Sequence, residues 1–392
     1  MSPNSWIPTV VVRPQLGESA IGLLIRHCEA NGWPRLHDFA DQIGTNASRT
    51  RWTPDLPVLE LVLGRPPGEL STMDRGRDGS AATLCGHRFP LRMVDKQTRR
   101  ICPDCTAEDG YMREWWELSF LYSCHRHSRE LTGLCPCGRP LAWDDALVGR
   151  CGRCAPETGT QVEAGGSAEP SRFERWVLGR IGILDAPCPN GILEMTSLPQ
   201  VVDAVEAVGL FVAAGYGKDR PIAADCGLSL RDVRLLGFDA IADGNLTVYI
   251  AASVREYCRV TGIALPDEPR WALGWFGDWI DGIAAFIDTP FLQPVLDGLS
   301  LEFGFPITNM RSIGMVSVER LAREVQVSVD PVRRMANHAG FAVKVHAGRW
   351  MLPNAFVPTL YEARYESRRK RRAGPGKSYG PKASTSAGLD PQ

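Results

Sequence analysis

The chain has 392 residues, of which 44% are hydrophobic and 23% are charged. This composition is ordinary for a globular protein and excludes a wholly disordered chain, while the length predicts about two to four domains. The 44 basic and 45 acidic residues leave a formal net charge of −1, so a surface that binds nucleic acid can only be a local patch. The absence of a run of roughly 20 apolar residues and of a signal-peptide pattern predicts a cytoplasmic protein without a membrane partner.

The first region, 1–99, is predicted to be a helical domain. A stripe of apolar side chains at helical spacing marks one core helix: Ile21, Leu24, Ile25 and Cys28. Ser19 is placed to cap the start of this helix, and Asn31-Gly32 is placed to end it. Gly and Pro recur at short intervals over 33–98, which favours short helices joined by loops.

The second region, 100–155, holds seven of the twelve cysteines. In a reduced compartment they are not expected to form a disulfide framework. With one histidine they make four candidate chelating pairs: Cys102/Cys105, Cys124/His127, Cys135/Cys137 and Cys151/Cys154. Three of the pairs have the C-x-x-C or C-x-x-H spacing, in which a tight turn aims two donors at one tetrahedral ion. Because thiolate and imidazole favour zinc over magnesium or calcium, the region predicts a double zinc-binding module of tandem zinc ribbons.

Eight donors close two four-ligand sites without an open position, so both zinc ions are predicted to be structural and not catalytic. The alternative is a chance cluster of buried cysteines. His125 competes with His127 as a ligand, but its place beside Cys124 would close a cramped chelate. The C-x-C pair of Cys135 and Cys137 is one residue shorter than a usual zinc knuckle, which leaves the geometry of the second site open. The pairing order is also open: two consecutive ribbons are the simpler choice, but an interleaved cross-brace would use the same residues.

Large apolar side chains separate the first two chelating pairs: Trp115, Trp116, Leu118, Phe120 and Leu121. We expect them to pack against the metal core, because a small zinc module buries little area by itself. An exposed binding surface is the alternative. The stretch 156–171 is rich in Gly, Glu and Ser without apolar periodicity, and is predicted to be a linker.

Helical periodicity returns in 172–300, which is predicted to be a second helical domain. Apolar side chains recur there at helical spacing: Phe173, Trp176, Val177, Val201, Val205, Val208 and Val212. Trp271, Trp275 and Trp279 then recur every four residues, followed by Ile283. Such a stripe predicts a helix buried in a core more often than a platform on which bases stack.

The region 301–360 has the pattern of a winged helix-turn-helix. One helix is marked by Val318, Leu321, Ala322 and Val325, and a turn at Gln326-Val327 leads to a second helix. The second helix has Ser328 or Asp330 as its cap and Pro331 in its first turn. Its inward-facing residues are Val332, Met335 and Ala336. Two β-prone runs then flank Ala347-Gly348. In this fold the second helix enters the major groove of DNA, so the outward Arg333, Arg334 and Asn337 are candidate contacts. The alternative is a helical hairpin used for packing or dimerisation, which Asp330 favours because its charge would repel phosphate.

The final region, 361–392, is basic and poor in apolar residues, so we expect a disordered tail. Its candidate DNA contacts are Arg368, Arg369, Lys370, Arg371 and Arg372. A basic arm of this kind binds phosphate without sequence preference and in a salt-sensitive way. The alternative is a solvated tail without a role in binding.

Catalytic patterns are weak throughout the sequence. Gly376-Lys377-Ser378 matches only the end of a phosphate-binding loop, because Arg371 occupies the position of the leading glycine. Cys28 beside His27 is only a weak candidate for a nucleophile with an adjacent base, and no set of carboxylates stands out as a two-metal site. We therefore predict that the protein is not an enzyme.

Two segments of 1–155 resemble the TniQ family of transposition proteins. One runs from a C-P-x-C element through an aromatic stretch to C-x-x-H and a further cysteine pair; its matching residues are Cys102, Pro103, Cys105, Asp109, Gly110, Cys124, His127, Leu131, Cys135 and Gly138. The other is RPQLGESAIGLLIRHCEANGW, which looks like the family's opening helix. The C-x-C at Cys135 and Cys137 departs from the family's commoner C-x-x-C.

The sequence pattern predicts a mainly α, multidomain protein, and the resemblance implies a nucleoid-associated selector of insertion sites for a Tn-type transposon. Such a protein binds DNA, a target-recognition complex or both, and recruits a transposition AAA+ ATPase, which in turn recruits the transposase. Some relatives bind an attachment site directly, and others ride on an RNA-guided complex that selects the target. The alternatives are a pure protein adaptor without DNA affinity, a zinc-containing transcription regulator, and a zinc-dependent nuclease or hydrolase. A homodimer is an additional expectation, because paired helix-turn-helix units bind two half-sites.

Overall fold

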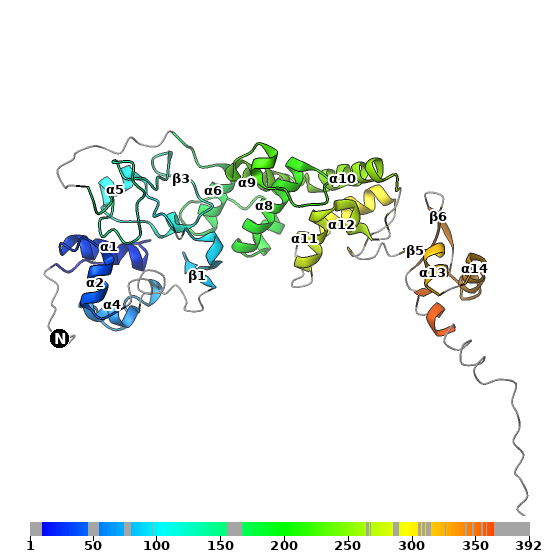
Figure 1. Ribbon diagram of the computed structural model, residues 1–392, viewed down its shortest axis with the longest axis horizontal. Coiled ribbons are helices and arrows are strands. Elements are labelled where there is room, and N and C mark those ends of the chain that lie inside the picture. The colour runs from blue at the N-terminus through cyan, green and yellow to red at the C-terminus, as the bar shows by residue number, and fades with distance from the viewer. Residues whose placement is uncertain are drawn as a thin grey trace, which may run out of the picture. The chain divides into compact units, whose positions relative to one another are not determined.

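The protein is described from a computed structural model of the full chain (Figure 1). The residues that the structure describes are 10–45, 55–73, 80–95, 97–154, 167–263, 266, 268–284, 290–304, 307, 310, 315–325, 327–341, 343–346, 349–353, 356–357 and 359–363. Among them, no helix combines the length and the apolarity that a membrane crossing requires. The basic residues Arg368, Arg369, Lys370, Arg371 and Arg372 of the predicted tail lie outside the described residues.

The described chain is mainly helical and divides into two compact units, Met1–Tyr249 with Asp288–Phe291 and Ile250–Ile287 with Leu292–Gln392. The helices and strands of the first unit are α1 (Ala20–Ala30), α2 (Leu36–Gln42), α4 (Leu56–Val62), β1 (Ala81–Leu84), β2 (His87–Pro90), α5 (Pro103–Asp109), β3 (Ser123–Cys124), β4 (Arg129–Glu130), α6 (Arg172–Arg180), α7 (Gly191–Met195), α8 (Leu198–Ala214) and α9 (Leu230–Ala242). Helix α10 (Leu246–Thr261) begins in the first unit and continues into the second. The other elements of the second unit are α11 (Trp275–Ala284), α12 (Leu292–Phe303), β5 (Met315–Ser317), α13 (Val318–Glu324), α14 (Val329–His338), β6 (Lys344–His346) and β7 (Arg349–Pro353). Short 3₁₀ helices connect several of these elements: η2 (Ser71–Met73), η3 (Leu91–Met93), η4 (Glu114–Glu117), η5 (Ala223–Cys226) and η6 (Pro269–Leu273).

Helix α1 confirms the prediction made from its apolar stripe. The Ser19 side chain accepts a hydrogen bond from the backbone N–H of Gly22, which satisfies one donor of the first turn. The helix ends at Ala30, with Asn31 as its C-cap, and Gly32 follows with a φ of +74°. Nearly the whole helix is buried, so it serves as a core element of the first unit.

The region 33–98 contains the expected short helices α2 and α4, but it also contains an unpredicted hairpin. Strands β1 and β2 pair antiparallel, with Leu84 opposite His87. The two residues between them, Cys85 and Gly86, have φ values of +49° and +75°. Two-residue hairpin turns need positive φ at these positions and usually carry Asn-Gly or Asp-Gly, so a Cys-Gly turn gives a weak sequence signal.

The helices after the predicted linker 156–171 pack closely onto one another. Residues 155–166 lie outside the described residues, and Ser171 caps α6 in a capping box with Glu174. The backbones of helices α8 and α9 approach each other closely at two glycines, since a Cβ at either Gly209 or Gly237 would lie 1.9 Å from a backbone oxygen of the facing helix. The prediction of buried valines on α8 is confirmed at Val201, Val205 and Val208.

The predicted tryptophan helix is wrong in its extent. Trp271 lies in η6, and α11 begins only at Trp275. Gly274 separates the two elements with a φ of +55°, which ends the 3₁₀ turn and interrupts helical spacing. As a consequence Trp271 is 44% exposed whereas Trp275 is 6% exposed, so these tryptophans do not form one buried stripe.

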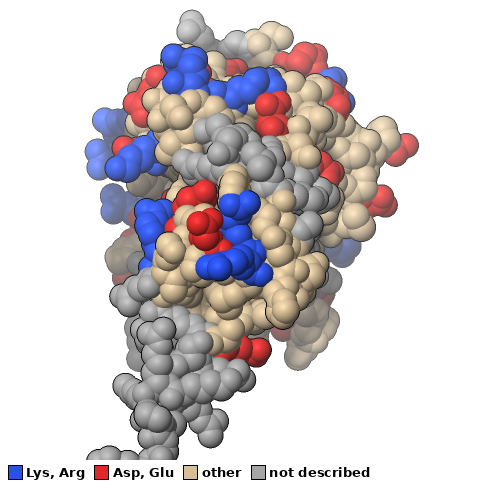
Figure 2. Space-filling view, turned by 90° about the vertical axis from the view of Figure 1, so that its right-hand side faces the viewer, with Lys and Arg blue, Asp and Glu red and all other residues tan. Residues whose placement is uncertain are grey.

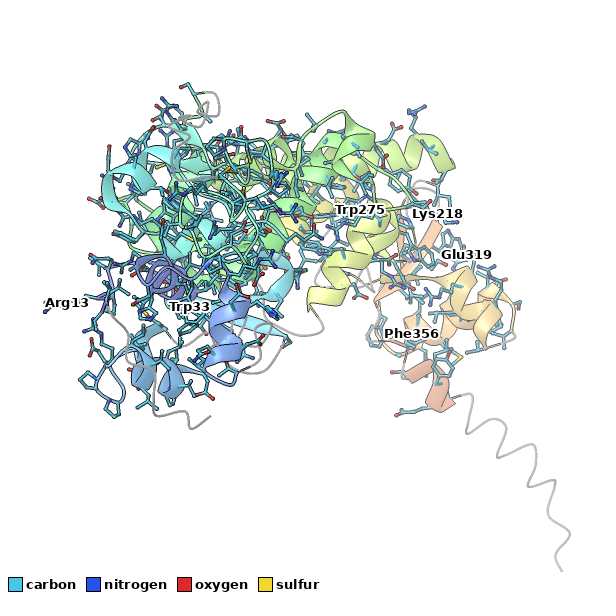
Figure 3. All side chains as sticks on the ribbon, turned by 60° about the vertical axis from the view of Figure 1, so that its left-hand side comes forward. Arg13, Trp33, Lys218, Trp275, Glu319 and Phe356 are labelled. Carbon is cyan, nitrogen blue, oxygen red and sulfur yellow. The ribbon has the colours of Figure 1, made fainter. Side chains whose placement is uncertain are left out.

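The segment from β5 to β7 contains the two helices and the hairpin predicted for 317–352. Its three strands form an antiparallel sheet in the order β5-β7-β6. Helices α13 and α14 cover a separate small core to which Leu321, Val332 and Phe356, the last labelled in Figure 3, contribute fully buried side chains. The assignment of this segment as a DNA-binding winged helix-turn-helix, like the predicted domain limits, stays a prediction.

Candidate metal centre

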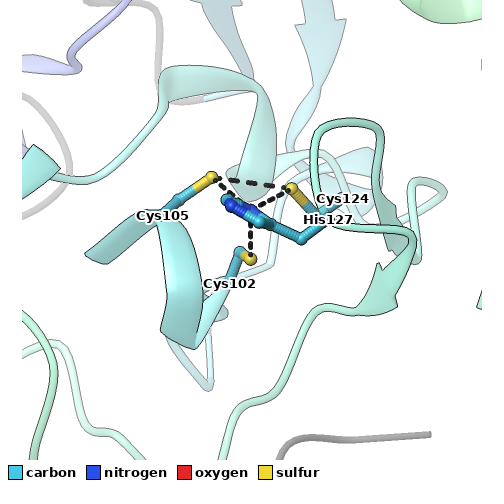
Figure 4. A group of neighbouring side chains, drawn as sticks. All are labelled: Cys102, Cys105, Cys124 and His127. Carbon is cyan, nitrogen blue, oxygen red and sulfur yellow. Dashed lines mark hydrogen bonds between the residues drawn. The ribbon is translucent and has the colours of Figure 1, made fainter. Parts of the chain in front are cut away.

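The first candidate site unites Cys102, Cys105, Cys124 and His127 (Figure 4). The Nδ1 atom of His127 lies 3.5 Å from the sulfur of Cys102, 3.3 Å from that of Cys105 and 3.7 Å from that of Cys124. The sulfurs of Cys105 and Cys124 lie 3.6 Å apart. All three sulfurs are buried with their residues, and the four donor atoms enclose one point.

These separations fit a tetrahedral ion. Zinc bonds of about 2.3 Å to sulfur and about 2.0 Å to nitrogen place tetrahedral ligands about 3.8 Å apart for two sulfurs and about 3.5 Å apart for sulfur and nitrogen. The observed distances lie within a few tenths of an ångström of those values. The sulfurs are also much too far apart for a disulfide bond of about 2.0 Å. The first group could therefore hold one metal ion.

Local structure places each of these four donors. Cys102 stands immediately before α5 and Cys105 lies in its first turn, with Pro103 at the first helical position, where no backbone donor is needed. Cys124 ends β3, and a tight turn with Ser128 at a φ of +49° returns the chain to β4. His127 lies in this turn, so a helix start and a hairpin turn face each other across the site.

The competing histidine is turned away from the donors. The His125 ring packs against Trp115, with 5.5 Å between the ring centroids. Burial lowers the pKa of His125, which favours the neutral ring in this apolar contact. The choice of His127 over His125 from the sequence agrees with this geometry.

The second candidate site unites Cys135, Cys137, Cys151 and Cys154. The sulfur–sulfur distances are 3.4 Å from Cys135 to Cys154, 3.5 Å from Cys137 to Cys151 and 3.5 Å from Cys151 to Cys154. The backbone N–H of Cys151 also donates to the sulfur of Cys135, at 3.3 Å. The four donors of the first group all precede the four donors of the second group in the chain. The structure therefore has two consecutive sites and not an interleaved cross-brace.

The short C-x-C spacing has a visible consequence in the second site. Gly138 follows with a φ of +79° and its N–H donates to the Cys135 carbonyl, which turns the chain directly after the pair. Cys137 remains exposed, whereas Cys135 and Cys151 are buried. A hydrogen bond from the Arg139 backbone and bonds with neighbouring thiols lower the pKa of Cys137 to about 7, which favours the thiolate that a metal needs.

The donors of the first site shift one another's pKa values. Hydrogen bonds with the Cys102 and Cys105 thiols lower the pKa of Cys124 well below its usual range, which favours the thiolate form. Burial lowers the pKa of His127, but bonds with Cys124 and Glu108 outweigh burial and raise the pKa above its ordinary value. Protons and a metal therefore compete for the same donors.

Two consecutive arginines brace the loops around the sites. Arg99 is fully buried and donates to the carbonyl oxygens of Asp145, at 3.0 Å, and Leu147, at 2.6 Å, in the loop before Cys151. Arg100 turns the other way and donates to the carbonyl oxygens of Leu121, at 2.6 Å, and Leu118, at 2.5 Å, in the loop before Cys124.

The aromatic stretch packs inward as predicted. Its five side chains are at most 2% exposed: Trp115, Trp116, Leu118, Phe120 and Leu121. This burial confirms the packing role and contradicts the alternative of an exposed binding surface. Helix α6 is also connected to the first site, because its Glu174 carboxylate accepts hydrogen bonds from the backbone N–H groups of Tyr122 and Ser123 beside Cys124.

The candidate DNA contacts on α14 differ in accessibility. Arg334 and Asn337 are exposed, as expected for the outward face. The Arg333 guanidinium instead lies over the ring of Trp350 on β7 and pairs with Asp330 at 3.7 Å. The Arg333 side chain is still 36% exposed, but the aromatic ring and the carboxylate hold its charge against the segment's own surface, and its role in DNA contact stays a prediction.

Sequence reasoning missed Arg99, Arg100 and Glu108, which contact the sites without being donors to them. For the arginines the sequence offers no signal beyond their place just before Cys102. For Glu108 a signal would have existed had the helix α5 been predicted, because Glu108 stands three residues after Cys105 and residues at that spacing share a helix face.

Comparison with known proteins supports the sequence resemblance. Residues 9–131 match the model of the TniQ family. All four donors of the first site lie inside this match, whereas those of the second site lie beyond its end. A search of the curated proteins found no match. The chain thus contains a region, residues 9–131, that matches the TniQ domain.

Proposed function

We propose that the protein is a non-catalytic target-site selection factor of a Tn-type transposon. The single observation that carries the proposal is the TniQ domain, which encloses the first donor group. In this role the chain binds target DNA and recruits a transposition AAA+ ATPase and through it the transposase. The site of action is the nucleoid, and a homodimer that binds two half-sites is part of the proposal.

Structural zinc is the metal that we assign to both donor groups. Three sulfurs with one imidazole nitrogen, and four sulfurs, are donor sets that select zinc over harder ions, and neither group has an oxygen ligand. Bound zinc would cross-link the start of α5 to the turn between β3 and β4, and Cys135/Cys137 to Cys151/Cys154. The zinc ions would therefore stabilise a folded scaffold and would leave no open coordination position for catalysis.

DNA contact is assigned to the segment from β5 to β7 and to the basic tail. Arg334 and Asn337 on α14 are the exposed candidates for base or phosphate contacts. Arg333 supports them indirectly, since its contact with Trp350 connects α14 to the hairpin of β6 and β7. On the face shown in Figure 2, basic and acidic side chains lie next to one another, so this face is not uniformly positive.

A gel-shift assay with the full chain and a salt titration tests this assignment. Arg334→Ala should weaken binding about 5-fold to 10-fold and lower the slope of log affinity against log salt by about 1, because one phosphate contact is lost. The matched control is Arg259→Ala on α10, which removes an exposed arginine that is paired with Glu256 at 2.6 Å and should leave binding unchanged.

The absence of DNA binding even at low salt would overturn the DNA-contact part of the proposal. If the chain then co-purified with an RNA-guided complex, the adaptor alternative would replace direct DNA recognition. Reconstituted transposition with the ATPase and transposase of the same element tests the recruitment role, and insertion at the usual site without this chain would contradict it.

A further inference from the structure

The first donor group has a carboxylate behind its histidine. The Nε2 atom of His127, on the side of the ring opposite Nδ1, lies 3.0 Å from an Oε1 oxygen of Glu108. The His127 side chain is 18% exposed and that of Glu108 is 50% exposed, so the bond lies at the edge of the site. Nδ1 meanwhile faces the three sulfurs at 3.3 to 3.7 Å.

Glu108 is itself held in place. Arg126, next to His127 in the turn, donates to the other carboxylate oxygen of Glu108 at 2.8 Å. Arg126 also pairs with Asp109, which accepts from Arg113 at 2.5 Å. Glu108 and Asp109 end helix α5, whose first turn supplies Cys105. The carboxylate is therefore fixed by the same two elements that supply the donors.

We propose that Glu108 is the residue that positions His127 for the metal. If His127 donates its Nε2 proton to Glu108, the neutral ring has its lone pair on Nδ1, toward the sulfurs. The carboxylate thereby selects the tautomer, fixes the plane of the ring and makes Nδ1 a stronger donor. This inference rests on the zinc binding proposed above and adds a residue to which the sequence pattern assigned no role.

The geometry distinguishes this role from that of a surface ion pair. An ion pair requires a protonated ring, but Nδ1 cannot carry a proton and bind a metal at once. Glu108 thus acts on a neutral ring through a directed hydrogen bond. The second donor group contains only cysteines, so it has no ring to orient and provides an internal reference within the same chain.

The test is zinc retention by the full, zinc-loaded chain against a competing chelator. Glu108→Ala should weaken the affinity for one of the two zinc ions by about 10-fold to 100-fold, the usual effect of removing a carboxylate behind a histidine ligand. Glu108→Gln should weaken it less, because the amide oxygen still accepts from Nε2. The other zinc ion should be retained as in the unaltered chain.

Two control variants separate positioning from general stability. Asp104→Asn on the same helix removes a carboxylate that pairs with Arg129 at 2.8 Å and should leave zinc affinity unchanged. Arg126→Gln removes a partner of Glu108 but leaves the bond to His127, and it should have a smaller effect than Glu108→Ala. Nitrogen-15 spectra of the imidazole rings should show His127 with its proton on Nε2 in the unaltered chain and a weakened hydrogen bond there in Glu108→Ala.

The outcomes separate this inference from the proposed function. If the unaltered chain binds two zinc ions and Glu108→Ala retains both with the same affinity, the role of Glu108 is wrong while the zinc scaffold stands. If the unaltered chain binds no zinc, both are wrong. If Asp104→Asn lowers zinc affinity as much as Glu108→Ala, the effect is one of helix stability, and the positioning role is also overturned.

Discussion

The two donor groups of the first unit differ in ligands, burial and place in the chain. The first has three cysteines and a histidine, lies inside the TniQ domain and has its cysteines fully covered. The second has four cysteines, lies past residue 131 and leaves Cys137 exposed. The first group joins a helix to a hairpin that contacts the aromatic core, whereas the second closes a loop near the surface. We infer that the first group supports the fold of the domain and that the second mainly orders its own loop.

The adjacent arginines extend this difference to the surrounding loops. Arg100 fixes the carbonyl groups of the loop that leads to the first group, and Arg99 does the same for the second. Because neighbouring side chains in extended backbone point to opposite sides, one dipeptide reaches both loops. The predictions below test the difference between the groups, beginning with the largest expected effect.

Cys124→Ser should remove the first metal site and destabilise the domain by more than about 4 kcal/mol, as losses of a structural metal can. The serine cannot replace a thiolate that three other donors face, and the turn that carries His127 would lose its link to α5. Zinc content should fall by one per chain, and the near-ultraviolet circular dichroism of Trp115 and Trp116 should collapse. A full-strength tryptophan signal in this variant would refute the structural role of the first group.

Arg100→Ala should cost about 2 to 4 kcal/mol, because it leaves several carbonyl groups without a donor at about 1 to 3 kcal/mol each. Arg99→Ala should lower the free energy of unfolding by a similar amount but loosen the loop before Cys151. Urea denaturation measures the two losses of stability, and amide hydrogen exchange shows which loop each variant affects. Exchange in Arg99→Ala should rise around 145–150, and a rise around 116–121 instead would contradict the assignment.

Cys137→Ser should release the second zinc ion at a cost of about 1 to 3 kcal/mol, within the ordinary range of a single substitution. The first site should stay filled and the tryptophan signal intact, since Cys137 lies at the surface. Metal analysis and circular dichroism of the variant provide the check. A loss of both zinc ions would show that the two groups fold as one unit, against the difference drawn here.

Arg129→Gln should change stability by less than about 1 kcal/mol. Its pair with Asp104 joins β4 to α5 across the first site, but both side chains are more than a third exposed and water screens the interaction. Thermal melting at low and high salt measures the effect. A loss as large as that of Arg100→Ala would mean that surface pairing, and not the metal and the buried arginines, holds the module together.

Local chemistry determined how much the sequence could predict. Spacing identified the eight donors, and the capping of α1 by Ser19 was predictable from its side chain. How the eight donors divide between the two sites was not predictable, because it depends on backbone pairing of Ile101 with Thr132, which brings distant segments together. The contact of Arg333 with Trp350 was hidden for the same reason, since helical periodicity says nothing of what a later strand places beside the helix.

Metal analysis of the purified, untagged chain before and after chelation tests the central claim most directly. We predict two zinc ions per chain, and after their removal a melting transition that is lowered and broadened, with loss of the tryptophan circular dichroism. A chain that contains no zinc, and that melts at the same temperature with and without a strong chelator, would contradict the account.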